Sequence, residues 1–264
     1  MSAEFIQNSS ASAELLRYFL KLSEVIILNR IVLMVLRNFW RVPTAYAKLC
    51  HYAKHTDKYP EEVKYRHIQY ILKLAVKSGN IDLKVTGTEN IPKEGGFLLY
   101  GNHQGMFDIL AIAATCDTPI AAVLKKELYN IPFLKQVVDC TKSFPMDRED
   151  VRQSLKVIQA VTQEVINGRS YLIFPEGTRS KNGNQMIEFH GGSFRCAVKA
   201  KCPIIPIALV DSYKVLDQKG CKPVTVQIHY LDPIPYEEYK GLKSLEVANM
   251  VHDRIEAAVK KYSE

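Results

Sequence analysis

A histidine and an aspartate, His103 and Asp108, stand five positions apart in a segment that reads NHQGMFD. A neutral imidazole can take a proton from a hydroxyl group when a carboxylate holds its second ring nitrogen and so fixes the tautomer. Within one regular helix this spacing would place the two side chains about 140° apart. The pair can therefore act together only if His103 precedes a helix that carries Asp108 in its first turns. The spacing alone leaves open a simpler alternative, a histidine that caps the helix.

Two further segments carry arginines suited to binding a phosphate, because a guanidinium stays charged and donates parallel hydrogen bonds. The segment FPMDRED contains Arg148, although such a run by itself is typical of the solvated start of a helix. The segment FPEGTRS is more specific: it places Glu176, Gly177 and Arg179 in a turn after an apolar run. The N–H groups of such a turn can also point at an anion.

Apolar runs that alternate with helical patterns must position these residues. Strands are expected at 81–85, 97–100, 120–124, 171–174, 204–210 and 224–230, and helices at 107–115, 155–166 and 244–262. This alternation predicts an α/β domain whose largely parallel sheet is covered by helices. His103 and FPEGTRS each follow a predicted strand, where open α/β sheets place their sites. The run CPIIPIAL, with two prolines, predicts an edge strand or a pocket wall.

The N-terminal third of the chain is both basic and apolar. Residues 1–78 hold 12 Lys/Arg against 6 Asp/Glu, and the stretch VIILNRIVLMVLRNFW lacks an uncharged run of the roughly 18–20 residues that a membrane span needs. It predicts an interfacial amphipathic helix, from about residue 11 to 41 and stopped by Pro43, with arginines along polar edges. Residues 1–78 are therefore interpreted as a membrane-association segment and residues 79–264 as the catalytic domain. The alternative is a helix that only packs on the domain.

Composition limits the other classes of function. The chain has 264 residues, 47% hydrophobic content and a net charge of +7, which allows one sizeable core. Its six cysteines form no C-x-x-C pair and there is no secretory signal pattern, so we expect reduced thiols, no metal site and a cytosol-facing protein. The positive charge suits nucleic acid or an anionic membrane. The lack of interleaved basic and aromatic strand motifs argues against nucleic acid.

Taken in order, NHQGMFD, the Arg148 segment, FPEGTRS and CPIIPIAL resemble the sequence blocks of the glycerolipid acyltransferase family. Within that family the chain is most similar in pattern to bacterial 1-acyl-sn-glycerol-3-phosphate acyltransferases, over roughly residues 85–235. The resemblance implies that His103 is the general base and that Asp108 orients it.

The resemblance assigns further residues by position. It implies that Arg148 and Arg179 bind the phosphate of the acceptor, and that Glu176 and Gly177 shape the turn. Lys125 would be a third phosphate ligand, a role that the neighbouring lysine could take instead.

The reaction implied by the resemblance moves a fatty acyl chain from a thioester to the sn-2 hydroxyl of lysophosphatidic acid, giving phosphatidic acid in phospholipid biosynthesis. Acyl-CoA or acyl-acyl carrier protein would be the co-substrate, with no other cofactor and no metal. We expect a peripheral protein on the anionic cytoplasmic face of the cell membrane, with acyl carrier protein as a possible partner. Glycerol-3-phosphate or another lysolipid is the alternative acceptor.

Two positions depart from the usual family pattern and bear on the choice of acceptor and donor. Gly105 stands where many members have serine, and His190 stands where many have lysine. Two other classes of function remain as alternatives. One is a serine hydrolase or thioesterase that uses Ser193, in the near-elbow GGSFR, and the other is a non-catalytic membrane-binding protein.

Overall fold

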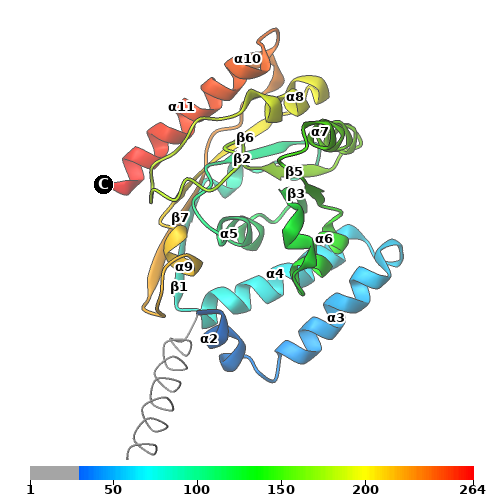
Figure 1. The fold of residues 1–264 in the computed structure, drawn as a ribbon, viewed down its shortest axis with the longest axis vertical. Coiled ribbons are helices and arrows are strands. Elements are labelled where there is room, and N and C mark those ends of the chain that lie inside the picture. Colours follow the sequence, from blue (N-terminus) through cyan, green and yellow to red (C-terminus); the bar gives the residue numbers. More distant parts are fainter. Residues whose placement is uncertain (1–29) are drawn as a thin grey trace, which may run out of the picture.

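The computed structural model describes residues 30–264, in which seven strands form one sheet (Figure 1). The strands are β1 (Ile81–Thr86), β2 (Leu98–Gly101), β3 (Ile120–Lys125), β4 (Phe144–Met146), β5 (Ser170–Ile173), β6 (Ile204–Val210) and β7 (Val224–Tyr230). Their order across the sheet is β1-β7-β6-β2-β5-β3-β4. Within the described residues every pairing is parallel except β6 with β7. The predicted α/β fold with a largely parallel sheet is confirmed.

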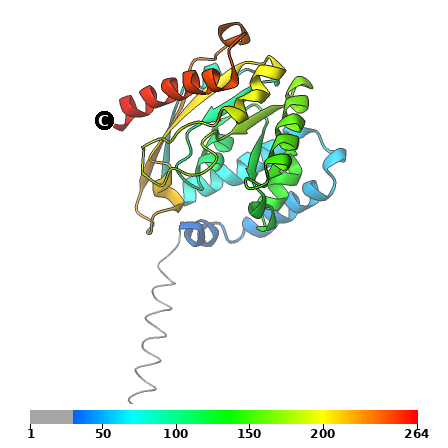
Figure 2. The same ribbon diagram turned by 45° about the horizontal axis from the view of Figure 1, so that its top comes forward.

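Helices cover both faces of the sheet (Figures 1 and 2). They are α2 (Arg30–Arg37), α3 (Val42–Lys54), α4 (Glu61–Ser78), α5 (Asp108–Thr115), α6 (Leu134–Thr141), α7 (Val151–Ile166), α8 (Gly191–Ala200), α9 (Tyr213–Leu216), α10 (Tyr236–Tyr239) and α11 (Ser244–Ser263). Successive strand residues point to opposite faces. Leu98 and Tyr100 therefore pack with α7, α8 and α11, whereas Leu99 packs with α5.

The helices α3 and α4 lie beneath α5 and α6 in Figure 1. Helix α4 begins after Pro60, which needs no helical N–H there, and ends at Ser78, with Gly79 as its C-cap. Its buried residues Tyr65, Ile68 and Leu72 pack on α5 and α6, and Leu49 of α3 joins them. This helical layer thus supports the side of the sheet that carries α5.

The predicted helix from residue 11 to 41 lies partly outside the described residues, and its predicted end is wrong. Helix α2 ends at Arg37, a turn follows, and α3 begins at Val42. Pro43 therefore lies in the first turn of a new helix rather than stopping the previous one. The first turn tolerates proline because its N–H groups have no acceptor within the helix.

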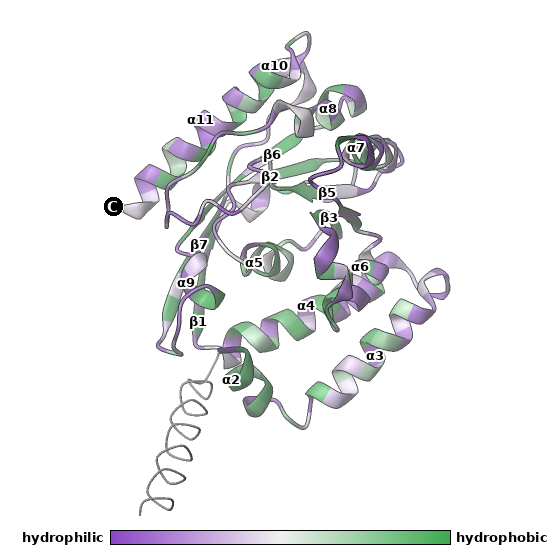
Figure 3. Cartoon of the chain, in the orientation of Figure 1, coloured by the Kyte–Doolittle hydropathy of each residue, from purple (hydrophilic) through white to green (hydrophobic). Residues whose placement is uncertain are grey.

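The arginines of α2 face the protein, a direction that the predicted polar edges did not specify. Arg30 is 4% exposed and donates to the carbonyls of Gly79 at 2.6 Å, Lys222 at 2.9 Å and Val215 at 3.0 Å. Arg37 donates to the carbonyl of Ser78 at 2.8 Å. Unsatisfied carbonyls at the ends of α4 and α9 attract these guanidinium groups. The polar edge of α2 consequently faces the protein, and its hydrophobic side faces outward (Figure 3).

The proline-rich run is not an edge strand. It forms β6, which is buried along its whole length and pairs with β2 on one side and β7 on the other. Both prolines of the run are tolerated. Pro203 precedes the strand, and the second proline lies just before Ile207, where the antiparallel hydrogen bonding to β7 starts. The short strand β4, just before Arg148, was not predicted.

Candidate active site

The turn between β2 and α5 brings His103 and Asp108 together. Asp108 is the first residue of α5 and His103 precedes the helix, as the spacing requires. Nδ1 of His103 lies 2.7 Å from Oδ2 of Asp108. When the carboxylate accepts the Nδ1 proton, Nε2 carries the lone pair and is the atom able to act as a base.

Asp108 is fully buried and is held by four donors. Besides the ring of His103, its Oδ2 accepts the backbone N–H of Gln104 at 2.6 Å and that of Gly105 at 2.9 Å. Its Oδ1 accepts the hydroxyl of Ser212. A buried carboxylate is acceptable only with such partners, since it otherwise loses its hydration without compensation. The four bonds fix the carboxylate and therefore the histidine.

The imidazole of His103 is held on its flat side as well. Its ring stacks on Phe174, with centroids 4.2 Å apart and an interplanar angle of 16°. The His103 side chain is 15% exposed, and its Nε2 makes no hydrogen bond within residues 30–264. The ring is thus oriented, and its second nitrogen is left for a substrate.

Glu176 lies under the same turn and is 1% exposed. Its Oε1 accepts the backbone N–H of His103 at 3.0 Å, while Oε2 has no partner in the described structure. Burial raises the pKa of the Glu176 carboxyl to about 8; the N–H of His103 opposes this rise and the charge of Asp108 adds to it. Near neutral pH the protonated form of Glu176 therefore predominates.

The next residue, Gly177, has φ of +66°, a conformation that favours glycine. A Cβ at this position would also lie 3.1 Å from Cδ2 of His190. The sequence-based prediction that Glu176 and Gly177 shape the turn agrees with these positions, although their roles stay a prediction.

The predicted phosphate ligands come from the carboxyl ends of neighbouring strands. Lys125 ends β3, Arg148 follows β4, and Arg179 lies in the turn after β5. Because β5, β3 and β4 are adjacent and parallel, these cations lie along the same sheet edge as His103. Arg148 is exposed and has no hydrogen bond or ion pair within the described residues, whereas Lys125 contacts Glu127 at 3.4 Å.

Arg179 is already paired, with Asp217, and the neighbouring lysine Lys126 is paired with Asp147. Sequence reasoning missed Asp217 as it missed Ser212. Both residues follow β6, more than 100 positions from the turn that they contact. A polar cluster, DSY, directly after an apolar strand was the available signal, since this is where α/β sheets gather functional residues.

Polar side chains also join β6 to the catalytic turn. Asn102 donates to the carbonyl of Leu209 at 3.0 Å and accepts its N–H at 2.8 Å. Gln104 donates to the same carbonyl and accepts the N–H of Ser212 at 3.0 Å. The NHQ sequence thus continues the sheet's hydrogen bonding beyond the end of β2, and this fixes the turn.

The geometry does not favour Ser193 as a nucleophile. Its hydroxyl donates to the backbone carbonyl of His190 at 2.8 Å, and in residues 30–264 no histidine ring nitrogen bonds to it. A serine nucleophile needs such a base. Nor do the described residues contain a group of three or more His, Cys, Asp or Glu side chains able to hold a metal ion.

Residues 82–210 match the family model for Acyltransferase. The 1-acyl-sn-glycerol-3-phosphate acyltransferase of Helicobacter pylori is 33% identical over 135 residues, which cover 49% of this chain and 57% of that protein. The chain thus spans little more than half the length of this relative. The probable 1-acyl-sn-glycerol-3-phosphate acyltransferase of Mycoplasma pneumoniae is 26% identical over 266 residues, 94% of both chains.

A solved structure has the same fold. The 1-acyl-sn-glycerophosphate (LPA) acyltransferase PlsC of Thermotoga maritima matches with a TM-score of 0.70 and 22% identity, over 88% of this chain and 96% of that one. At this identity the likeness shows the fold alone.

Proposed function

We propose that this protein is a 1-acyl-sn-glycerol-3-phosphate acyltransferase, which transfers a fatty acyl group to the sn-2 hydroxyl of lysophosphatidic acid and so forms phosphatidic acid. The observation that carries the proposal is the oriented His103–Asp108 pair, with Nε2 open, beside cations at the same sheet edge. The names of the related proteins support the same acceptor.

The reaction needs one base and no covalent enzyme intermediate. Nε2 of His103 takes the proton of the sn-2 hydroxyl as its oxygen attacks the thioester carbonyl. The tetrahedral oxyanion collapses, the C–S bond breaks, and the carrier thiolate receives the proton from His103. Asp108 stabilises the transient imidazolium, because its Oδ2 accepts the Nδ1 proton throughout. A positioned base of this kind contributes about 10²–10⁴-fold.

The acceptor's phosphate has the sheet-edge cations as partners. Arg179 would bind it bidentately from the FPEGTRS turn, and Arg148 and Lys125 would add charge from the neighbouring strands. Arg148 supports this assignment because it lacks an ion pair among the described residues. The acyl donor would be acyl-CoA or acyl-acyl carrier protein.

Attachment to a membrane surface would bring the enzyme to this lipid acceptor. Within residues 30–264, no helix has the length and hydropathy to cross a bilayer. The outer side of α2, the turn after it and the start of α3 nevertheless expose large apolar side chains: Ile31, Val32, Val35, Leu36, Phe39, Trp40, Val42 and Tyr46. We call this set the N-terminal apolar face. Such a face suits the interface of an anionic bilayer, and the cytoplasmic leaflet is the one that carries anionic lipids.

Thiol release from an acyl-CoA tests the proposed reaction. Wild-type protein should release free thiol with lysophosphatidic acid and form phosphatidic acid, while His103→Ala should be slower by about 10²–10⁴-fold. His55→Ala is the matched control, since His55 is only half-buried and, among the described residues, its ring hydrogen-bonds to the carbonyl of His51 and stacks on the His51 ring. Equal rates for wild type and His103→Ala would overturn the proposal. If thiol is released with glycerol-3-phosphate but not with lysophosphatidic acid, the acceptor is instead glycerol-3-phosphate.

A further inference from the structure

One carboxylate, that of Asp217, joins the two turns of the candidate active site. Its Oδ1 accepts from Nη1 of Arg179 in the FPEGTRS turn. Its Oδ2 accepts the backbone N–H of Met106, in the turn between His103 and α5, at 2.8 Å. Asp217 directly follows α9, a short helix that comes after β6. Through Asp217, the segment after β6 therefore reaches into the catalytic turn.

The close approach of Asp217 depends on the glycine at position 105. A Cβ built on Gly105 would lie 2.4 Å from Oδ2 of Asp217 and 2.9 Å from the Cα of Tyr213. Both distances are shorter than real Cβ contacts, and the second involves backbone that cannot swing aside. Asp217 therefore occupies space that a side chain at position 105 would need.

The donors that hold Asp217 are the ones an anionic ligand would use. A guanidinium and a backbone N–H at the start of a helix both favour phosphate oxygens. The Asp217 side chain is 23% exposed and that of Arg179 is 35% exposed, so solvent and ligand can reach the pair. An ion pair with this exposure is weak and can be exchanged for another anion.

We propose that Asp217 is an internal anion in the acceptor's phosphate site, and that the phosphate must displace it from Arg179 and the Met106 N–H. This inference rests on the proposed function, in which Arg179 binds that phosphate. Asp217 then determines specificity: a phosphate monoester, with up to two charges, displaces a carboxylate, whereas an acceptor without a free anionic group leaves Arg179 neutralised.

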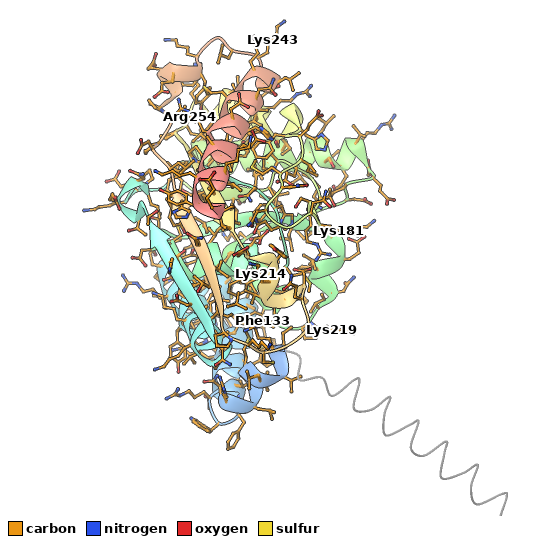
Figure 4. All side chains as sticks on the ribbon, turned by 90° about the vertical axis from the view of Figure 1, so that its left-hand side faces the viewer. Phe133, Lys181, Lys214, Lys219, Lys243 and Arg254 are labelled. Atoms are coloured by element: carbon orange, nitrogen blue, oxygen red, sulfur yellow. The ribbon has the colours of Figure 1, made fainter. Side chains whose placement is uncertain are left out.

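The basic surroundings of Asp217 fit an arriving anion. Lys181 follows the FPEGTRS turn, Lys214 lies in α9 and Lys219 lies two residues after Asp217, and Figure 4 shows the three on the same part of the molecule. Lys214 is paired with Asp211 at 2.8 Å, but Lys181 and Lys219 have no ion pair among the described residues. These lysines favour approach of an anionic acceptor over a neutral one.

Asp217→Asn tests the displacement directly through kinetics. The variant should lower the KM for lysophosphatidic acid roughly two- to five-fold, the strength of one exposed ion pair, with the change in KM rather than kcat. A raised or unchanged KM would show that Asp217 positions Arg179 for the substrate and would overturn the proposal. Glu238→Gln is the control, because it breaks another exposed pair, Glu238–Arg254, and Figure 4 shows Arg254 well apart from Lys214 and Lys219.

Binding of inorganic phosphate gives a second readout that needs no acyl transfer. Phosphate should raise the Tm of Asp217→Asn more than that of wild type, because a ligand that binds the folded state stabilises it. This measurement separates the two proposals. If the protein transfers no acyl group but phosphate still raises the Tm of the variant more than that of wild type, only the proposed function is contradicted. Equal phosphate stabilisation in both proteins would sink the role of Asp217.

The contact between Gly105 and Asp217 is tested without any ligand. Gly105→Ala should lower Tm, and adding Asp217→Ala should restore part of the loss, because the shortest contact then disappears. Strictly additive effects would show that the two residues are not in contact and would remove the structural basis of the proposal.

Discussion

At the scale of single residues, the site depends on groups that act on His103 from several directions. Asp108 holds Nδ1, Phe174 supports the ring, and Glu176 holds the backbone N–H. Glu176 differs from the other two because one of its carboxyl oxygens is buried without a partner among the described residues. Burying an oxygen without a hydrogen-bond partner costs much less free energy for a neutral carboxylic acid than for a carboxylate.

The raised pKa of Glu176 predicts how stability changes with pH. Its folded-state pKa, about 8, lies above the ordinary value of 4.5. Below pH 4.5 both the folded and the unfolded chain are protonated here, so this contribution to stability is fully present. Between pH 4.5 and about 8 the unfolded chain loses the proton and the folded one keeps it, so the free energy of unfolding falls as pH rises.

Glu176→Gln isolates this effect, because glutamine resembles the protonated acid in shape and cannot ionise. The stability of the variant relative to wild type should therefore rise from pH 5 to pH 8, as measured by denaturant unfolding at each pH. A constant difference across this range would contradict the assignment. His103 and Asp108 face position 176 in both proteins, so the comparison isolates the side chain at that position.

At the scale of elements, the sequence predicted the features that depend only on residues close together in the chain. The position of His103 before α5 followed from helical geometry, and every strand except β4 followed from apolar or alternating runs. Which strands neighbour each other depends on contacts between distant segments, so the central place of β6 was not predicted. The partners Ser212 and Asp217 were missed for the same reason, because only the folded sheet brings them to the catalytic turn.

The inward arginine of α2 shows a second limit of sequence reasoning. Periodicity correctly separated a polar edge from an apolar one but did not show which of them faces the protein. Arg30 is buried because three backbone carbonyls accept from it, and their positions depend on the ends of α4 and α9 and on the loop before β7. Without this information the sequence predicted a polar edge but not a buried arginine.

Arg30→Ala should destabilise the protein by roughly 2–5 kcal/mol, because two buried carbonyls and one partly buried carbonyl would lose a charged donor. Denaturant unfolding measures the change. Arg41→Ala is the control, since Arg41 is exposed and its guanidinium lies over the Trp40 ring at the surface. A similar small loss in both variants would contradict a structural role for Arg30.

At the scale of the whole molecule, the N-terminal apolar face gathers eight exposed apolar residues at one end, although other exposed apolar residues, such as Val151 in α7, occur elsewhere in the described structure. Phe39 is 64% exposed and Trp40 is 59% exposed, on the N-terminal apolar face. Leu245, at the start of α11, is also 58% exposed but lies at the opposite end of the molecule (Figure 1). A surface with large aromatic rings on a single side favours one orientation on a bilayer.

Removing the two rings should release the protein from lipid. Phe39→Ser with Trp40→Ser should weaken binding to anionic vesicles by at least about ten-fold, because burying each ring contributes roughly 1.5–3 kcal/mol. Co-sedimentation with phosphatidylglycerol-containing vesicles measures the change, and Leu245→Ser is the matched control. Unchanged binding of the double variant would contradict the role of this face.

The buried guanidinium of Arg30 has a consequence for how far the catalytic base stands from a lipid surface. It ties α2, which carries part of the N-terminal apolar face, to the end of α4 through Gly79 and to α9 through Val215, two residues before Asp217. The N-terminal apolar face, which would rest on the bilayer, is thus held in a fixed position relative to α9 and Asp217, which reach the catalytic turn. We expect this brace to set the height of His103 above the acyl chains, so that the protein selects hydroxyl groups by their depth in the headgroup layer as well as by their charge.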